Sequence, residues 1–103
     1  MAHSVSGHLG LRIADYDTLI RRLVPAYAAM RPVQLDLLAL ALPDGGAGKR
    51  VLDLGGGTGA LAGAIAERFP AATVEIWDTD PAMLAVARER CAGFGERVSF
   101  VAR

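Results

Sequence analysis

"VLDLGGGTGAL", residues 51–61, places four glycines within five positions directly after an apolar run. The run RVLDL favours a short buried strand over 50–54, and the Ala- and Leu-rich ALAGAIAERF favours a helix over 60–69. Glycines at such a junction permit positive φ for a sharp turn and leave the N–H groups at the helix start open to a ligand. Because a tight turn alone needs only one or two glycines, the loop predicts a ligand-binding site. Its glycines are Gly55, Gly56, Gly57 and Gly59.

The segments after this loop predict an α/β fold with a parallel sheet. TVEIWD is β-branched and alternating and predicts a second strand over 73–78, and RVSFVA predicts a third over 97–102. Between them, Asp80 as N-cap and Pro81 in the first helical position predict a helix over 80–91, which a turn at GFGE follows. Strands that alternate with helices of this length imply right-handed crossovers and therefore a parallel sheet.

The first half of the chain predicts helices that precede the sheet. Residues 1–13 are expected to form an arm, and DYDTLIRRLVPAY predicts a helix that Pro25 ends or kinks. A second helix is expected from Pro32, in its first turn, to Leu42. The turn cluster PDGGAGK then separates these helices from the first strand.

Composition excludes several classes of protein. Eleven basic and eleven acidic side chains give a formal net charge of zero, which argues against nucleic-acid binding by bulk electrostatics but leaves an RNA substrate in a local pocket open. No apolar stretch approaches the roughly 18 residues of a membrane span. The single cysteine, Cys91, favours a structural thiol, a reduced cytoplasmic setting and no metal cluster. His3 and His8 are expected as tail or lid residues rather than metal ligands.

Two acidic residues narrow the class of ligand. Asp78 ends the second predicted strand, where a carboxylate can accept hydrogen bonds from two ribose hydroxyls. Together with the glycine loop it predicts an adenosine-type ligand. The loop also satisfies a loose G-x-G-x-x-A dinucleotide pattern, which is a weak signal alone. Asp53 stands two residues before the first loop glycine and suits a ligand with a cationic amine better than a pyrophosphate, which it would repel.

At this point the chain resembles the class I S-adenosylmethionine-dependent methyltransferases. VLDLGGGTG resembles their first motif, VEIWDTDPAML their second, and RVSFVA is similar to their third strand. The likeness covers about residues 49–103. It implies a Rossmann-like, three-layer parallel sheet that is incomplete here, with about three strands, and S-adenosylmethionine as the cofactor.

The resemblance also implies roles for individual residues. Gly55, Gly57 and Gly59 would line the methionine part of the cofactor, with Gly56 in the same loop. Asp53 would lie near the amino group and Asp78 would hold the ribose hydroxyls. Thr79 and Met83 would border the ribose or adenine, although Met83 is equally suited to the core. The residues suggested for a substrate lid are Tyr16, Arg22 and Tyr27.

Three functions remain open on these residues. The leading interpretation is a methyltransferase whose acceptor is an unidentified small molecule and whose catalytic base is not identified. The chain would consist of an arm and helical lid over 1–48 and a cofactor-binding half over 49–103. Because the family sheet has seven strands, this chain resembles a truncated form, and its unpaired sheet edge suggests a homodimer. The alternatives are an NAD(P)-binding domain of an oxidoreductase and a non-catalytic dimerising module.

Overall fold

The computed structural model describes residues 15, 17–18, 20, 22 and 27–103. The expected arm over 1–13, with both histidines, lies outside the described residues. Of the first predicted helix, the described residues are helical: Asp15, Asp17, Thr18, Ile20 and Arg22. The elements that follow are α3 (Tyr27–Ala39), η1 (Asp44–Gly46), β1 (Arg50–Leu54), α4 (Ala60–Arg68), β2 (Thr73–Asp78), α5 (Pro81–Arg90), η2 (Ala92–Arg97) and β3 (Val98–Ala102).

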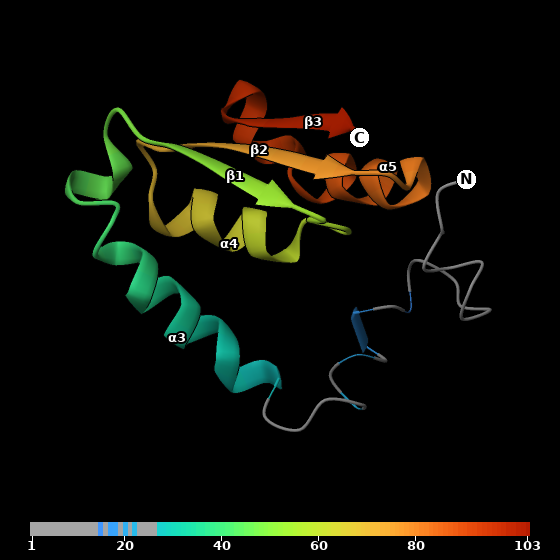
Figure 1. The fold of residues 1–103 in the computed structure, drawn as a ribbon, viewed down its shortest axis with the longest axis horizontal. Coiled ribbons are helices and arrows are strands. Elements are labelled where there is room, and N and C mark those ends of the chain that lie inside the picture. Colours follow the sequence, from blue (N-terminus) through green and yellow to red (C-terminus); the bar gives the residue numbers. More distant parts are fainter. Residues whose placement is uncertain (1–14, 16, 19, 21, 23–26) are drawn as a thin grey trace.

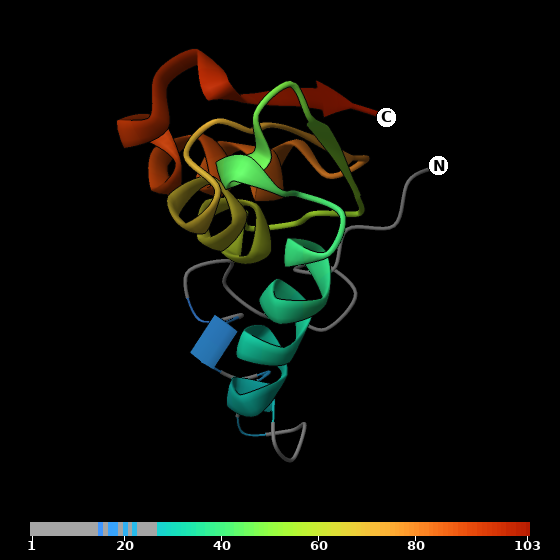
Figure 2. The ribbon, with the colours of Figure 1, turned by 90° about the vertical axis from the view of Figure 1, so that its left-hand side faces the viewer.

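The sheet is parallel and has the order β1-β2-β3. In the register, Asp53 pairs with Ile76, and Ile76 pairs with Phe100. Helices α4 and α5 both pack on one face of the sheet, as the two views of the ribbon show (Figures 1 and 2). The predicted Rossmann-like α/β fold is confirmed in its incomplete form, and the described residues supply the sheet and one of its helical layers.

The core lies between the sheet and these two helices. Its largest fully buried side chains are Val74 and Ile76 from β2, Ile65 from α4 and Cys91 after α5. On the opposite face of the sheet, Leu52 is 51% exposed and Leu54 is 69% exposed. The strand β1 thus has one face in the core and one face open to solvent, and its inward side chains include Asp53. No helix in the described part of the chain has the length and apolar character to cross a membrane.

The start of α5 forms as its sequence predicts. The Asp80 side chain accepts a hydrogen bond from the Ala82 N–H at 2.9 Å, and Pro81 occupies the first turn. An N-cap carboxylate satisfies a helical N–H that has no partner within the helix, and proline lacks the N–H that would otherwise be unpaired. This cap fixes the chain direction directly after β2, and therefore fixes the segment around Asp78.

The prediction for the helix before the sheet is wrong at both ends. The helix α3 begins at Tyr27 instead of Pro32 and ends at Ala39 instead of Leu42. Pro32 lies inside it, where proline removes one helical hydrogen bond. Apolar side chains of α3 pack against the core and offset that loss: Leu35, Leu38 and Ala39. The division of the chain near residue 48 stays a prediction, since α3 shares this core.

The third strand begins one residue later than predicted, at Val98. Arg97 belongs instead to η2, the short helix that replaces the expected turn. Its guanidinium donates to the carbonyl oxygens of Ala66 at 2.9 Å, Ala72 at 3.1 Å and Phe69 at 3.3 Å. These carbonyls lie at the end of α4 and just beyond, where carbonyl groups lack helical partners. Arg97 therefore closes the end of α4 rather than starting the strand.

Candidate cofactor-binding site

A cavity of about 250 Å³ lies at the carboxyl ends of β1 and β2, beside the loop that follows β1. In parallel sheets this edge is where ligands bind, because the loops and helix N-termini converge there. Most of the residues predicted from the sequence line it: Asp53, Gly55, Gly56, Gly57, Asp78 and Met83. The glycine loop thus borders a real cavity, and both predicted acidic residues face the same space.

The glycine loop needs its glycines for two different reasons. Gly55 and Gly57 have φ of 68° and 57°, a left-handed conformation that side chains disfavour. Gly56 has ordinary φ, but a Cβ on it would lie 2.6 Å from Ile76 Cγ2 and 2.8 Å from Asp53 Oδ2. The Gly55 N–H donates to the Trp77 carbonyl at 2.7 Å, which holds the turn against β2. Close packing against Ile76 and Asp53 therefore requires glycine at position 56, and the backbone hydrogen bond to Trp77 holds Gly55.

Gly59 serves packing rather than the cavity. It precedes α4 with φ of 79°, and a Cβ there would lie 3.0 Å from Ala87 Cβ and 3.3 Å from Cys91 Sγ. Its missing side chain lets α4 approach α5 closely. Among the described residues, the cavity lining includes neither Gly59 nor Thr79. Thr79 is exposed. A ligand contact for either residue stays a prediction.

Asp78 anchors the loop and faces the cavity. Its Oδ2 accepts from the Gly57 N–H at 2.9 Å, and its Oδ1 accepts from the Asp80 N–H at 2.8 Å. A carboxylate has about four acceptor positions, so each oxygen keeps one for a further donor. Two hydroxyls on adjacent carbons of a ribose match this pair of oxygens. The backbone bonds orient the carboxylate before any ligand arrives.

Asp53 carries an unsatisfied buried oxygen. Its Oδ2 is buried and has no hydrogen-bond partner within the described part of the chain. Burial raises the pKa of the Asp53 carboxyl above 3.8, nearby Arg31 lowers it, and the charge of Asp78 raises it further. A buried acceptor without a donor is costly unless a ligand supplies one. A cationic donor suits Asp53 best, because it would satisfy the oxygen and offset the repulsion from Asp78.

We expect Asp53→Asn to stabilise the ligand-free protein at pH 7. Because the pKa of Asp53 is higher in the folded than in the unfolded state, its carboxyl group stabilises the fold below pH 3.8, where it is protonated in both states. This stabilisation is lost as the pH rises through the pKa of the folded state. At neutral pH the charge is therefore a cost, about 1 kcal/mol after solvent screening, and its removal should raise Tm by about 4–8 °C. Thermal unfolding between pH 4 and 7 measures the gain, which should shrink at the acidic end.

The control for this variant is Glu67→Gln, which neutralises an exposed carboxylate on α4. Its free energy of unfolding should stay within about 0.5 kcal/mol of that of the parent protein, so its Tm should barely change. A Tm of Asp53→Asn at or below that of the parent would contradict the account of Asp53 as an uncompensated buried charge.

Helix α3 contributes two cavity residues that the sequence prediction did not include. Arg31 and Gln34 both line the cavity, and the Arg31 Nε donates to the Gln34 side chain at 3.2 Å. The signal in the sequence was a polar pair three residues apart on a largely apolar helix, a spacing that puts both side chains on one face. Arg31 brings a positive charge into a cavity whose lining also includes three acidic residues: Asp17, Asp53 and Asp78.

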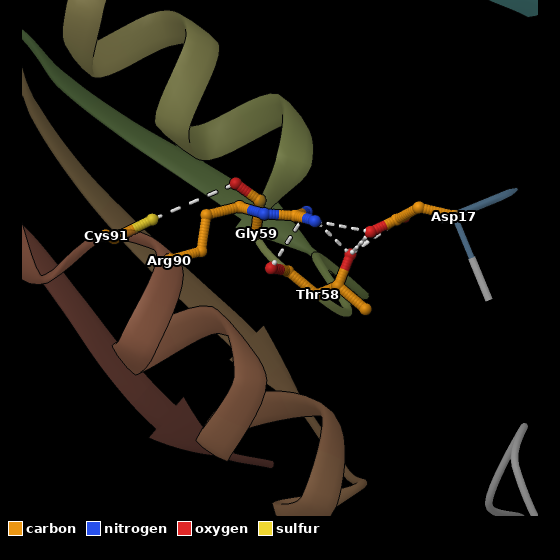
Figure 3. A network of polar contacts seen from close by, with 5 residues as sticks. All are labelled: Asp17, Thr58, Gly59, Arg90 and Cys91. Carbon is orange, nitrogen blue, oxygen red and sulfur yellow. Dashed lines mark hydrogen bonds and ion pairs between the residues drawn. The ribbon is translucent and has the colours of Figure 1, made fainter. Parts of the chain in front are cut away.

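A polar network connects the helical residues before α3 to the glycine loop (Figure 3). The Thr58 hydroxyl donates to the Asp17 carboxylate at 3.0 Å. Arg90, at the end of α5, donates to the Thr58 hydroxyl at 3.0 Å and carbonyl at 3.2 Å, and pairs with Asp17 at 2.6 Å. Asp17 and Thr58 also line the cavity. The network thus forms part of the cavity wall.

The structure does not test the residues predicted for a substrate lid. Arg22 is exposed, Tyr16 lies outside the described residues, and the Tyr27 side chain is likewise not described. Their role stays a prediction. Met83 is buried, as its alternative role in the core predicts, with 2% of its surface exposed, and it also lines the cavity. Its contact with the ribose or adenine stays a prediction.

Cys91 has the structural role that its sequence context predicts. It is 2% exposed, and its Sγ lies 3.8 Å from the Gly59 carbonyl oxygen. Burial raises the pKa of the thiol, and the positive charge of the nearby Arg90 offsets part of this increase. A buried thiol with a raised pKa is a poor nucleophile. Over the described residues, no group of three His, Cys, Asp or Glu side chains could hold a metal ion.

Comparisons with known proteins agree with this geometry. A trans-aconitate 2-methyltransferase from Mycobacterium sp. (strain KMS) is 51% identical over 55 residues, which are 53% of this chain and 21% of that protein. A malonyl-[acyl-carrier protein] O-methyltransferase from Geobacter sulfurreducens is 37% identical over 90 residues, 86% of this chain and 31% of that protein. The chain thus spans between a fifth and a third of the length of these relatives.

Solved structures share the fold. An S-adenosylmethionine-bound amino pentose methyltransferase from Micromonospora echinaspora superposes with a TM-score of 0.60 at 35% identity, covering 84% of this chain and 34% of that one. A methyltransferase from Thiobacillus denitrificans in complex with S-adenosylhomocysteine gives a TM-score of 0.53 at 30% identity, covering 70% and 29%. The family model described as "Methyltransferase domain" matches residues 51–103, about half of the chain. With its glycine loop, Asp53 and Asp78 all inside that match, this chain belongs to the methyltransferase domain family.

Proposed function

We propose that the cavity beside the glycine loop binds S-adenosylmethionine and that the protein uses it to methylate a small-molecule acceptor. The observation that carries this proposal is the buried, unpartnered Oδ2 of Asp53, which lies next to Gly56 of the glycine loop. A cofactor with an ammonium group would supply the donor that this oxygen lacks. Because the relatives are three to five times longer than the matched part, methyl transfer is proposed for the whole protein.

The residues around the cavity suit the parts of this cofactor. Asp78 presents two carboxylate oxygens to the ribose hydroxyls, and Asp53 would accept from the amino group. Arg31 lines the same cavity and would bind the carboxylate at the end of the methionine part. The opposite charges of Asp53 and Arg31 together match an amino-acid zwitterion. Met83 would contact the apolar face of the adenine or ribose, and Thr79 would border it.

The bound cofactor supplies an electrophilic methyl group on a sulfonium sulfur. What this chain contributes to the reaction is position, which is a large part of the rate enhancement when two reactants must be aligned. The Asp78 bonds to Gly57 and Asp80 orient its carboxylate, and the glycine loop, which has no side chains at Gly55 and Gly57, would let the backbone lie close to the cofactor. No residue is assigned as a base, and the acceptor would enter from the open side of the cavity.

Binding experiments separate this proposal from an NAD(P)-binding domain. A pyrophosphate would bring negative charge toward Asp53 and Asp78, whereas S-adenosylmethionine and S-adenosylhomocysteine both bring an ammonium group that can donate a hydrogen bond to Asp53. Isothermal titration of the full chain with S-adenosylhomocysteine should give saturable binding of one equivalent, and titration with NADH should give none. Saturable binding of NADH alone would overturn the proposal.

The remaining parts of the proposal concern setting and partners. A balanced net charge supports a small-molecule acceptor over a nucleic acid, and a single buried thiol supports a cytoplasmic setting. A dimerising module without catalysis is the second candidate, which the exposure of Leu52 and Leu54 on the edge strand β1 favours. Sedimentation analysis that finds a dimer, together with no S-adenosylhomocysteine binding, would favour this second function.

A further inference from the structure

We propose that Asp17, Thr58 and Arg90 form a latch that holds the helical segment around residue 17 against the glycine loop and slows cofactor release. The inference rests on the proposed function for its cofactor. The three residues are far apart in sequence, since Asp17 lies 41 positions before Thr58 and 73 before Arg90. They come from the segment before α3, the loop before α4 and the end of α5, and meet at one place (Figure 3).

Thr58 is the centre of the latch. It is 3% exposed, its hydroxyl donates to Asp17, and the same hydroxyl accepts from Arg90 Nη1. Arg90 also donates to the Thr58 carbonyl, so the backbone of the loop is held as well as the side chain. Thr58 stands between two glycines of the loop, Gly57 and Gly59. A change at Asp17 or Arg90 is therefore transmitted directly to the glycine loop that lines the cavity.

The latch also completes the cavity wall. Asp17 and Thr58 both line the cavity, whereas Arg90 is not among its lining residues in the described part of the chain. Opening the latch would remove the wall on the Asp17 side while α3 keeps its own residues, Arg31 and Gln34, in place. Arg90 thus acts through Asp17 and Thr58 and is a positioning residue.

The charges suit a reversible closure. The side chains of Arg90 and Asp17 are 37% and 23% exposed, so water and salt reach their ion pair. Ion pairs of this kind are weak and screened by salt, although the charged hydrogen bond from Thr58 adds to this one. In the described part of the chain, the Asp17 carboxylate contacts the Arg90 guanidinium and the Thr58 hydroxyl. Removing the guanidinium should release the segment without disturbing the buried core of β2 and α4.

The test is Arg90→Gln in the full chain, with Arg88→Gln as the matched control. Arg88 is an exposed arginine on the same helix that lies over the Phe100 ring instead of pairing with Asp17. In the protein without ligand, hydrogen exchange should increase in the peptide over 15–22 for Arg90→Gln and stay unchanged in the peptide over 73–78. The dissociation rate of S-adenosylhomocysteine should rise about tenfold, and Arg88→Gln should leave both quantities unchanged. Arg90→Lys keeps a charge for Asp17 and should restore part of the slow dissociation.

A double variant makes the coupling explicit. Asp17→Asn alone should increase exchange and dissociation to a similar extent, and adding it to Arg90→Gln should produce little further change. Unchanged exchange over 15–22 in both single variants would overturn the latch. Increased exchange that spreads to 73–78 would overturn it too, because Arg90 would then support the core. If the parent protein binds no S-adenosylhomocysteine, the proposed function fails, while the exchange measurement still tests the latch.

Discussion

Asp78→Ala is expected to weaken S-adenosylhomocysteine binding by about 100-fold or more. The carboxylate holds the Gly57 and Asp80 N–H groups at 2.9 and 2.8 Å and leaves two acceptor positions facing the cavity. Each hydrogen bond between a charged acceptor and a ligand hydroxyl contributes about 1.5–3 kcal/mol, so losing two of them accounts for this factor. Isothermal titration gives the affinity, and circular dichroism shows whether the variant is folded.

The control variants separate binding from folding. Asp36→Ala removes an exposed carboxylate that pairs with Arg68 at 2.8 Å outside the cavity, and it should leave the affinity unchanged. Asp78→Asn keeps the shape of the side chain, but its amide NH₂ would face one of the two backbone donors, so it should not restore binding. A folded Asp78→Ala protein whose affinity stays within about threefold of the parent would contradict the assignment of the ribose to Asp78.

The sheet and its loop could be predicted from sequence because their signals are local. The bounds of β1 and β2 are as predicted, and the Asp80 cap and Pro81 set the start of α5. Each of these rests on a few adjacent residues whose preferences agree with the tertiary structure. The sequence places Asp53 and Asp78 near the ends of two neighbouring parallel strands. Because such strand ends meet at one edge of the sheet, the two residues could be expected on the same side of the cavity.

The helix before the sheet shows where local signals fail. Pro32 usually marks a helix start, but α3 accommodates it in its interior. Apolar residues also occur on the solvent side of α3, where Met30 is 44% exposed and Leu37 is 63% exposed, so the pattern did not define one buried face. Packing against the core decides the bounds of this helix, and packing cannot be read from the segment alone.

The rest of the site depends on contacts over long distances in sequence. Asp17, Arg31 and Arg90 come from three separate segments, and no spacing in the chain links them to the glycine loop. Thr58 lies within the loop, but its importance follows from the partners of its hydroxyl rather than from its position. The sequence therefore predicts the part of the cavity made by β1 and β2, whereas the part made by helices requires the fold.

Gly59→Ala is expected to destabilise the protein by about 2–5 kcal/mol. The new Cβ would lie 3.0 Å from Ala87 Cβ, 3.2 Å from Ala87 Cα and 3.3 Å from Cys91 Sγ, at a φ of 79°. The left-handed backbone costs an alanine about 1–2 kcal/mol and overpacking between α4 and α5 about 1–3 kcal/mol more. The free energy of unfolding of small domains is about 5–15 kcal/mol in total, so this loss is a large part of it. Tm should therefore fall by at least about 10 °C. Thermal unfolding followed by circular dichroism measures the loss.

Gly48→Ala separates the two contributions to this loss. Gly48 has a similar φ of 72°, but a Cβ there would meet no atom within 4 Å, so only the backbone cost of about 1–2 kcal/mol applies. The difference in Tm between the two variants therefore measures how closely α4 approaches α5. Equal losses would contradict the packing role of Gly59. If Gly59→Ala is studied well below its Tm, its affinity for S-adenosylhomocysteine should stay within about threefold of the parent, because Gly59 acts between the helices and only indirectly on the cavity.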